Sequence, residues 1–293
     1  MNRRVVFLVT SPRLPAGILT AEAWDLLRAH PVVAQSESEL ARLAEAEIMP
    51  QPTAEKLLAK ADPVVVWLAG PHGDEALARE LGLRALREPA ELELMYGSWD
   101  PPGARLLDAV TVINRLHAED PWKREQTHRT LAKYLIEEAY EAHEAILAGD
   151  HEALRGEMGD VLLQVLLHSR MAEELPPDEA WNIDDVAGDF VAKMIRRNPH
   201  VFGDVMVEDT AEIMENWERI KREERPRKSL LDGVTWSLPA LMLAAEVLSR
   251  AGFKPPADDS AGGRLLKLVW EMGPDADAEG ELREAVRRYA EGL

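Results

Sequence analysis

Two stretches decide the fold of this chain: LAKYLIEEAYEAHEAI at residues 131–146 and EMGDVLLQVLLH at residues 157–168. Apolar residues in the first stretch recur at helical spacing, which predicts an amphipathic helix. The second stretch begins with acids and is then apolar nearly all round, which predicts a buried helix. Because only a short segment around Gly149-Asp150 separates them, we expect the two helices to pack antiparallel as a hairpin.

Carboxylates interrupt the apolar faces of both predicted helices. On the first helix, the apolar stripe consists of Leu131, Tyr134, Leu135, Ala142, Ala145 and Ile146. Glu138 lies in the middle of this stripe and Glu141 at its edge, stacked at positions i and i+3. The second helix carries a narrow polar strip, which consists of Glu157, Asp160, Gln164 and His168. The hairpin therefore brings two stacked pairs of carboxylates toward one space.

A divalent cation would offset the free-energy cost of placing these carboxylates on apolar faces. A carboxylate on an apolar face is unfavourable unless it is compensated, and stacked anions repel each other. Oxygen ligands without His or Cys suit Mg²⁺ or Mn²⁺. In a chain with 53 acidic residues, a solvated acidic face is the alternative. We favour a metal site because Glu138 and Glu157 lie on faces that are predicted to be buried.

Two glycines stand inside the second helix. Gly156 and Gly159 each cost about 1 kcal/mol relative to alanine in a helix interior. They indicate either the close approach of a ligand or helix, or a frayed start of the helix.

Composition bounds the classes of function. The 293 residues suggest roughly two domains, and 46% hydrophobic with 30% charged residues is typical of a globular chain. A net charge of −19 argues against binding a nucleic-acid polymer or an anionic membrane. The chain has no cysteine, which excludes disulfides, thiolate zinc sites and a cysteine nucleophile and fits the cytoplasm. The apolar run Val5–Val9 is too short for a signal peptide, and no stretch reaches the length of a membrane span.

The pattern along the chain predicts an α+β protein with several domains. Residues 1–95 form a small α/β domain, with strands at 5–9 and 64–68, a helix capped by Thr20, and a helix at 76–81 that ends at Gly82. The Pro- and Gly-rich residues 96–103 form a linker. Residues 104–254 are all-α, with predicted helices near 104–118, 130–148, 152–174, 181–197, 208–224 and 238–251. Residues 255–293 add one helical segment from about residue 265 and another near 279–291.

The acidic residues belong to a wider set of motifs. EEAYE at residues 137–141 is followed, after fifteen residues, by EMGD at residues 157–160. Four other segments accompany them in order: PWKREQTH at 121–128, NPHVF at 198–202, NWERIK at 216–221 and SLPAL at 237–241. Over about residues 104–252 the chain resembles the MazG-type nucleoside triphosphate pyrophosphohydrolases, the all-α NTP pyrophosphatases, whose signature is EExxE followed by ExxD.

This resemblance implies a fold, an activity and site residues. The family hydrolyses a nucleoside triphosphate (NTP) between the α- and β-phosphates to NMP and diphosphate, and its fold is an all-α dimer with four-helix-bundle-like sites. The implied Mg²⁺ ligands, with Mn²⁺ as a substitute, are Glu138, Glu141, Glu157 and Asp160. Lys193 and Arg197 match positions that touch the triphosphate, and Trp217 matches a nucleotide-contacting position. Beside these, we expect Glu137 either to orient or deprotonate the attacking water or to be a simple surface acid.

The chain departs from the family pattern at both ends. Residues 261–264, AGGR, align with 157–160, EMGD, so both acids of a second site are replaced. We therefore interpret residues 255–293 as a degenerate remnant of a second MazG-like repeat. The N-terminal segment weakly resembles a truncated tetrapyrrole-methylase-like domain. It is short for a working methylase and lacks a glycine-rich loop for the cofactor, so we expect it to be non-catalytic.

Three other classes of protein remain as alternatives. A di-iron bundle needs two Glu-x-x-His motifs, and only Glu125 and His128 have that spacing. A prenyl-diphosphate enzyme needs DDxxD, and the run from Asp184 to Asp189 is one residue too long. A non-catalytic helical adaptor that keeps the MazG scaffold would not need buried anions. Our first hypothesis is a cytoplasmic, homodimeric, Mg²⁺-dependent NTP pyrophosphohydrolase of broad specificity that removes NTPs or dNTPs from the nucleotide pool.

Overall fold

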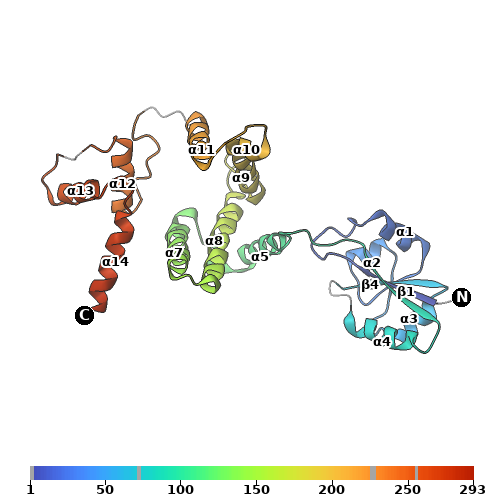
Figure 1. Cartoon of the computed structure of the whole chain (residues 1–293). Coiled ribbons are helices and arrows are strands. Elements are labelled where there is room, and N and C mark those ends of the chain that lie inside the picture. Colours follow the sequence, from blue (N-terminus) through green and yellow to red (C-terminus); the bar gives the residue numbers. More distant parts are fainter. Residues whose placement is uncertain (1–2, 71–73, 225–228, 255–256) are drawn as a thin grey trace. The chain divides into compact units, whose positions relative to one another are not determined.

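The computed structural model describes residues 3–70, 74–224, 229–254 and 257–293. It divides into two compact units, Met1–Val186 and Ala187–Leu293. The first contains a parallel β-sheet and a helical hairpin, and the second is helical in its described residues (Figure 1). The predicted domain limits at residues 95, 103 and 254 stay predictions. Within the described ranges, no helix combines the length and the apolarity needed to cross a membrane.

Five parallel strands form the sheet of the first unit, in the order β3-β2-β4-β1-β5. Their bounds are β1 Arg3–Val9, β2 Val32–Ala34, β3 Glu47–Ile48, β4 Val64–Ala69 and β5 Ala90–Tyr96. The central strands β1 and β4 are almost fully buried, because helices cover both faces of a parallel sheet. One face packs against α1 (Ala21–Ala29) and α2 (Glu39–Leu43). The other packs against α3 (Ala54–Lys60) and α4 (Glu75–Ala85).

The α/β prediction for the N-terminal segment is confirmed in part. Strands β1 and β4 and helix α1, which Thr20 caps, lie where the sequence predicts them. Helix α4 does not end at Gly82, as predicted, but continues to Ala85 with Leu86 as its C-cap. Nothing lies within 4 Å of the position that a Cβ at Gly82 would occupy, so this glycine is an ordinary interior residue. It costs the helix about 1 kcal/mol without breaking it.

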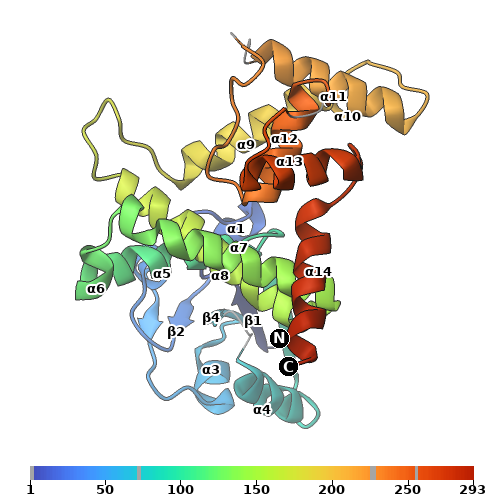
Figure 2. The same cartoon turned by 90° about the vertical axis from the view of Figure 1, so that its left-hand side faces the viewer.

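The predicted helical hairpin is present in the first unit. Helices α7 (His128–Ala148) and α8 (His151–Ala172) lie side by side in both views (Figures 1 and 2). Gly149 joins them with a left-handed backbone, φ 67°, which glycine adopts without strain. Thr127 begins α7 with a capping box and Asp150 caps α8. Helices α5 (Arg105–Glu119) and α6 (Pro121–Arg124) precede the hairpin, and the sequence did not predict α6.

The core of the hairpin is smaller than the sequence pattern indicates. Its buried residues are Ile113, Leu131, Leu166, Leu167 and Met171. Of the predicted apolar stripe on α7, Leu131, Ala142 and Ala145 are buried. In contrast, Leu135 is 39% and Ile146 57% exposed, so burial of the whole stripe is wrong for the single chain. The outer part of the stripe faces away from α8 and is left uncovered.

The second unit consists of helices in its described residues. They are α9 (Ile183–Arg197, which begins in the first unit), α10 (Pro199–Phe202), α11 (Thr210–Glu224), α12 (Ala240–Arg250), α13 (Ala261–Met272) and α14 (Ala278–Glu291). A small core of Leu248, Val269 and Ala278 joins the last three. Trp270 Nε1 donates a hydrogen bond to the carbonyl of Phe253 (2.8 Å). All predicted helices of this part are present, with ends moved by at most about four residues.

Candidate metal centre

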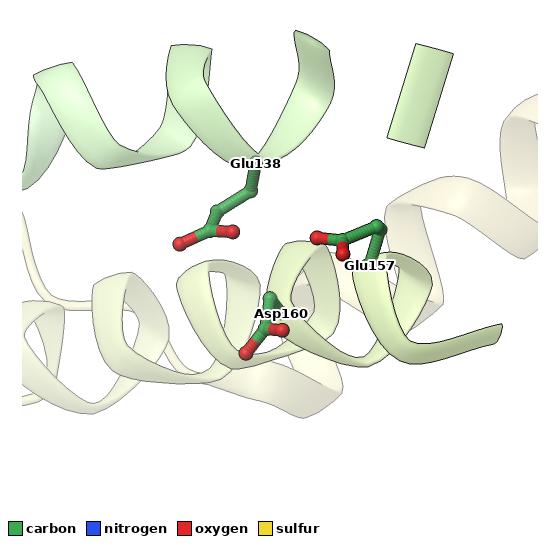
Figure 3. A group of neighbouring side chains, drawn as sticks. All are labelled: Glu138, Glu157 and Asp160. Atoms are coloured by element: carbon green, nitrogen blue, oxygen red, sulfur yellow. The ribbon is translucent and has the colours of Figure 1, made fainter. Parts of the chain in front are cut away.

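Three of the predicted ligands come together between α7 and α8. Carboxylate oxygens of Glu138, Glu157 and Asp160 lie within 4.8 Å of one another. Glu138 extends from α7 toward α8, which carries the other two (Figure 3). Glu138 and Glu157 are half-buried, whereas Asp160 is exposed. The group is thus an assembled set of carboxylates with access from solvent.

The hairpin itself produces this assembly. Glu157 and Asp160 are three residues apart on α8, so their side chains lie on one face of that helix. The Gly149 turn sets the register that brings the middle of α7 opposite them. Burial of Leu131 and Leu167 fixes which face of each helix meets the other. The position of the acids therefore follows from the periodicity of the apolar residues.

The carboxylates raise one another's pKa values. The pKa of Glu138 is raised by burial first and then by the negative charges of Asp160, Glu141, Glu157 and Glu137. The pKa of Glu157 is raised by burial, by the charge of Glu141 and by a hydrogen bond with that residue. This repulsion between carboxylates is unfavourable in free energy, and a cation bound between them would remove it.

The remaining predicted acids lie beside this group. Glu141 lies close enough to Glu157 for its charge to raise the pKa of that residue. Together with Glu137 and Glu157, it lines a neighbouring cavity of about 660 Å³ between α7 and α8. Glu137 itself is exposed. The structure thus places all five predicted acids in one neighbourhood, and their individual roles stay predictions.

The donor set fits a hard divalent cation. All ligand atoms of the group are carboxylate oxygens, which are the ligands that Mg²⁺ and Mn²⁺ prefer. The di-iron alternative would use His128, but this side chain instead contacts His168, with 2.7 Å between the two Nδ1 atoms. The donor chemistry therefore favours Mg²⁺ or Mn²⁺ over a di-iron centre.

Another cavity, of about 410 Å³, opens at the carboxyl ends of β1, β2 and β4. Its lining includes Ser11, Ser98 and the carboxylates of Glu39 and Asp74, and among the described residues that line it there is no Lys, Arg or His. This cavity is more enclosed than the acidic one between α7 and α8.

The predicted phosphate-binding residues belong to the second unit. Lys193 is exposed on α9. Arg197, one turn later, forms an ion pair with Glu224 of α11 (Nη2–Oε2 2.5 Å), and its guanidinium lies 5.3 Å from the ring centroid of Trp217. Arg196 also binds Glu224 (2.7 Å), and the two arginines lower the pKa of Glu224 to about 2. Arg197 and Trp217 are thus brought together, and Arg197 already has an anionic partner.

The sequence analysis assigned no role to several polar residues near the hairpin. The carbonyl oxygen Oε1 of Gln164 is buried without a hydrogen-bond partner among the described residues, one helical turn beyond Asp160. His117 Nε2 lies 2.9 Å from Glu174 Oε1. Gln164 and His168 were visible as part of the polar strip on α8. The sequence contains no signal that pairs His168 with His128, because helical phase does not identify contacts between helices.

The comparisons with known proteins agree on one family. The model of the MazG nucleotide pyrophosphohydrolase domain matches residues 126–202, a range that includes the acidic group. A Streptomyces cacaoi protein, described as an uncharacterized 26.1 kDa protein in the blaB 3' region, is 44% identical over 229 residues, or 75% of this chain and 93% of that one.

Two named relatives extend the comparison. The nucleoside triphosphate pyrophosphohydrolase/pyrophosphatase MazG of Thermotoga maritima is 37% identical over 216 residues, which cover 63% of this chain and 82% of the relative. The nucleoside triphosphate pyrophosphohydrolase of Mycolicibacterium smegmatis is 39% identical over 191 residues, or 64% of this chain, and the match spans only 58% of that relative. The fold, the assembled acids and these similarities lead to one conclusion: the chain belongs to the MazG family.

Proposed function

We propose that this protein is a Mg²⁺-dependent nucleoside triphosphate pyrophosphohydrolase, which converts an NTP or dNTP and water to the monophosphate and diphosphate. The observation that carries the proposal is the convergence of Glu138, Glu157 and Asp160 within 4.8 Å. Membership of the MazG family supports the same activity, since two relatives bear the name of this enzyme.

The acids would hold the cation, and Glu141 would complete the set from its place close to Glu157. A divalent cation held by these residues would supply activation of the attacking water and neutralisation of charge on the leaving diphosphate. Ionised Glu138 and Glu157 are needed for this role. Because repulsion raises their pKa values, we expect cation binding to release protons and to weaken in acid.

The remaining predicted residues would act on the substrate. Glu137, exposed beside the cluster, would accept a proton from the attacking water or orient it. Lys193 and Arg197 would bind the phosphate chain. For Arg197 this means sharing its guanidinium between the substrate and Glu224. Trp217, which is half-buried under Arg197, would offer a face for the base.

The setting of this activity is also part of the proposal. We place it in a cytoplasmic homodimer that acts on several NTPs and dNTPs in nucleotide-pool housecleaning. The α/β segment at the N-terminus would be non-catalytic, and residues 255–293 would serve packing or dimerisation as the remnant of a second repeat. The lack of cysteine fits a reducing compartment.

Product identification on a panel of NTPs and dNTPs with Mg²⁺ tests the activity. With an α-labelled NTP, we expect labelled NMP together with diphosphate. Labelled NDP with free phosphate would mean attack at the γ-phosphorus and would refute the proposed reaction. Absence of hydrolysis across the panel would favour the non-catalytic helical adaptor.

A further inference from the structure

A pair of histidines joins α7 to α8 at the end of the hairpin opposite the Gly149 turn. His128 is the first residue of α7, and His168 lies one turn before the end of α8. Their Nδ1 atoms are 2.7 Å apart, the ring planes differ by 11° and the ring centroids are 5.0 Å apart. Because the nitrogens are much closer than the centroids, the rings meet edge to edge through a hydrogen bond.

This contact requires a defined number of protons. One proton must lie between the two Nδ1 atoms, and a neutral pair carries its second proton on Nε2 of one ring. Nε2 of His168 is buried and has no hydrogen-bond partner in the described part of the chain. A proton there would be an unsatisfied buried donor. The neutral pair is therefore satisfied best when His168 donates from Nδ1 and His128 carries its proton on Nε2.

Added protons oppose the contact. A third proton on the pair would occupy the buried Nε2 of His168, so that both rings carry an Nε2–H group. A fourth proton would occupy Nδ1 of His128 and remove the acceptor of the hydrogen bond between the rings. Consistent with this, the pKa of His168 is lowered, by burial first and then by the charge of His128. The contact is thus a property of the neutral pair and weakens as pH falls through the histidine range.

Other ionisable groups at this end of the hairpin do not account for the lowered pKa of His168. They include His117 from α5, Glu125 after α6, Arg129 from α7, Arg170 from α8, and Glu173 and Glu174 from the segment after α8. His117 contacts Glu174, and Arg170 contacts both glutamates. Trp181, also from the segment after α8, lies 6.2 Å from the His128 ring, centroid to centroid. Among the described charged groups, His128 is the one whose charge shifts the pKa of His168.

The acidic group lies between the two places where the helices are joined. Glu138 is ten residues from His128, about 15 Å along α7, and Asp160 is eight residues from His168, about 12 Å along α8. The carboxylates repel one another across the hairpin, which acts to spread the helices. The turn resists spreading at one end, and the histidines resist it at the other.

We propose that His128 and His168 are positioning residues that keep Glu138 close to Glu157 and Asp160, and that protonation of the pair loosens the cation site. This inference rests on the proposed cation site but not on hydrolysis. It predicts an effect on cation affinity that a purely structural contact would not show, namely a part of the pH dependence, beyond that of the carboxylates, which is lost when residue 168 cannot titrate.

Binding of Mn²⁺ to the full chain, followed by electron paramagnetic resonance, tests the positioning role. His168→Phe keeps a ring but removes the hydrogen bond, and we expect about 10-fold weaker binding, as for the loss of other supports around metal ligands. His168→Asn retains an amide donor for His128 Nδ1, and we expect affinity within about twofold of the wild type. The matched control is His143→Asn, at an exposed histidine of α7, which should leave the Mn²⁺ affinity unchanged.

The pH dependence separates positioning from simple packing. Between about pH 8 and pH 5, the wild type and His143→Asn should lose about 10-fold more affinity than His168→Asn, since only they keep the titrating pair. Circular dichroism verifies that each variant is folded. Unchanged Mn²⁺ affinity in a folded His168→Phe, or equal pH dependence in the wild type and His168→Asn, would overturn the proposal.

Ring-nitrogen NMR of the ¹⁵N-histidine-labelled chain gives a second, independent test. We expect His168 as the Nδ1–H tautomer with a pKa below that of an ordinary histidine, assigned by its loss in His168→Asn. An Nε2–H tautomer or ordinary titration at His168 would contradict the assignment. A protein that shows both histidine effects but hydrolyses no NTP would keep this inference and lose the proposed function.

Discussion

At Glu138 a carboxylate lies on the inner face of a helix near four others whose charges raise its pKa, and among the described residues no positive side chain is a cause of that shift. The sequence located this residue because helical phase alone places it on the apolar stripe. The same argument located Glu157 and Asp160. Glu141 was predicted as a ligand of the same cation, but it lies outside the group of three, because a residue at the edge of a stripe can turn toward the cluster or toward solvent.

Removal of single carboxylates tests their role in the reaction. Glu138→Gln, Glu157→Gln and Asp160→Asn, and also Glu141→Gln, should each lower kcat/KM by about 1000-fold or more, since several kcal/mol of charge stabilisation would be lost. Helical circular dichroism should be unchanged. Glu152→Gln, an exposed acid in the first turn of α8, is the control. Full activity in any two of the four variants would contradict the ligand assignment.

The same residues should make the metal-free protein sensitive to pH. Raised pKa values at Glu138 and Glu157 mean that the folded state holds protons more tightly than the unfolded state. The contribution of these two residues to stability is therefore greatest below the ordinary pKa of 4.5 and falls as pH rises through the raised pKa values.

In chelator near neutral pH, Glu138→Gln should raise Tm by about 2 °C, and the difference from the wild type should vanish on acidification toward pH 4.5. Differential scanning calorimetry checks this, with Glu152→Gln as control. A lower Tm for Glu138→Gln near neutral pH would mean that the carboxylates do not repel one another.

The contribution of Glu224 to stability should have the opposite pH dependence. Its pKa of about 2, against an ordinary 4.5, comes from hydrogen bonds with Arg197 and Arg196. Its contribution to stability is present above pH 4.5 and is lost as pH falls toward about 2. In urea titrations, Glu224→Gln should therefore unfold earlier than the wild type at neutral pH, with a gap that narrows below pH 4.5. A gap independent of pH would show that the ion pairs contribute nothing.

At the scale of elements, glycines of the hairpin have different roles. Gly149 has a positive φ in the turn, whereas Gly156 and Gly159 lie inside α8, and a Cβ at any of them would meet nothing within 4 Å. The two interior glycines therefore mark neither a frayed start nor a close approach to another described part of the chain. Gly149→Ala should lower the free energy of unfolding by about 1 kcal/mol.

Gly156→Ala is the matched comparison, since only helix propensity changes there. It should raise the free energy of unfolding by up to about 1 kcal/mol. Urea titrations of the two variants measure both effects. A stabilising Gly149→Ala would show that the turn does not need its left-handed backbone. A strongly destabilising Gly156→Ala would show that another chain or a ligand approaches α8 there.

The sequence predicts long elements with a clear repeat of apolar residues, and it does not predict elements that are short or exposed. Helices α5, α7 and α8 have many turns of repeating apolar residues, so their phase is readable. Strands β2 and β3 have three and two residues, too few to show alternation. Strand β5 alternates Glu91, Leu92, Glu93 and Leu94 at an exposed edge, and its partner β1 is distant in sequence. Such pairing is decided by tertiary contacts, which a local pattern does not contain.

At the scale of the whole molecule, the uncovered part of the α7 stripe bears on assembly. Leu135 and Ile146 are apolar at positions where the sequence predicts burial, yet they are exposed in the single chain. We expect a second copy of the chain to cover them, in the predicted homodimer. Sedimentation velocity at micromolar concentration should show a dimer, and Leu135→Glu with Ile146→Glu should shift it to monomer.

Leu43→Glu, at an exposed leucine of α2, is the control for this change and should leave the dimer intact. A wild-type chain that sediments as a monomer would mean that the stripe has another occupant or none. In a dimer, the sequence pattern would reflect burial in the assembly, of which the single chain shows only part.

The most direct measurement of the central claim is the anomalous scattering of Mn²⁺ in a crystal of the protein soaked with that cation. We predict a peak between α7 and α8, about 2.0–2.2 Å from carboxylate oxygens of Glu138, Glu157 and Asp160. A map without a peak there, or with these carboxylates turned apart into solvent, would contradict the assignment of the cation site.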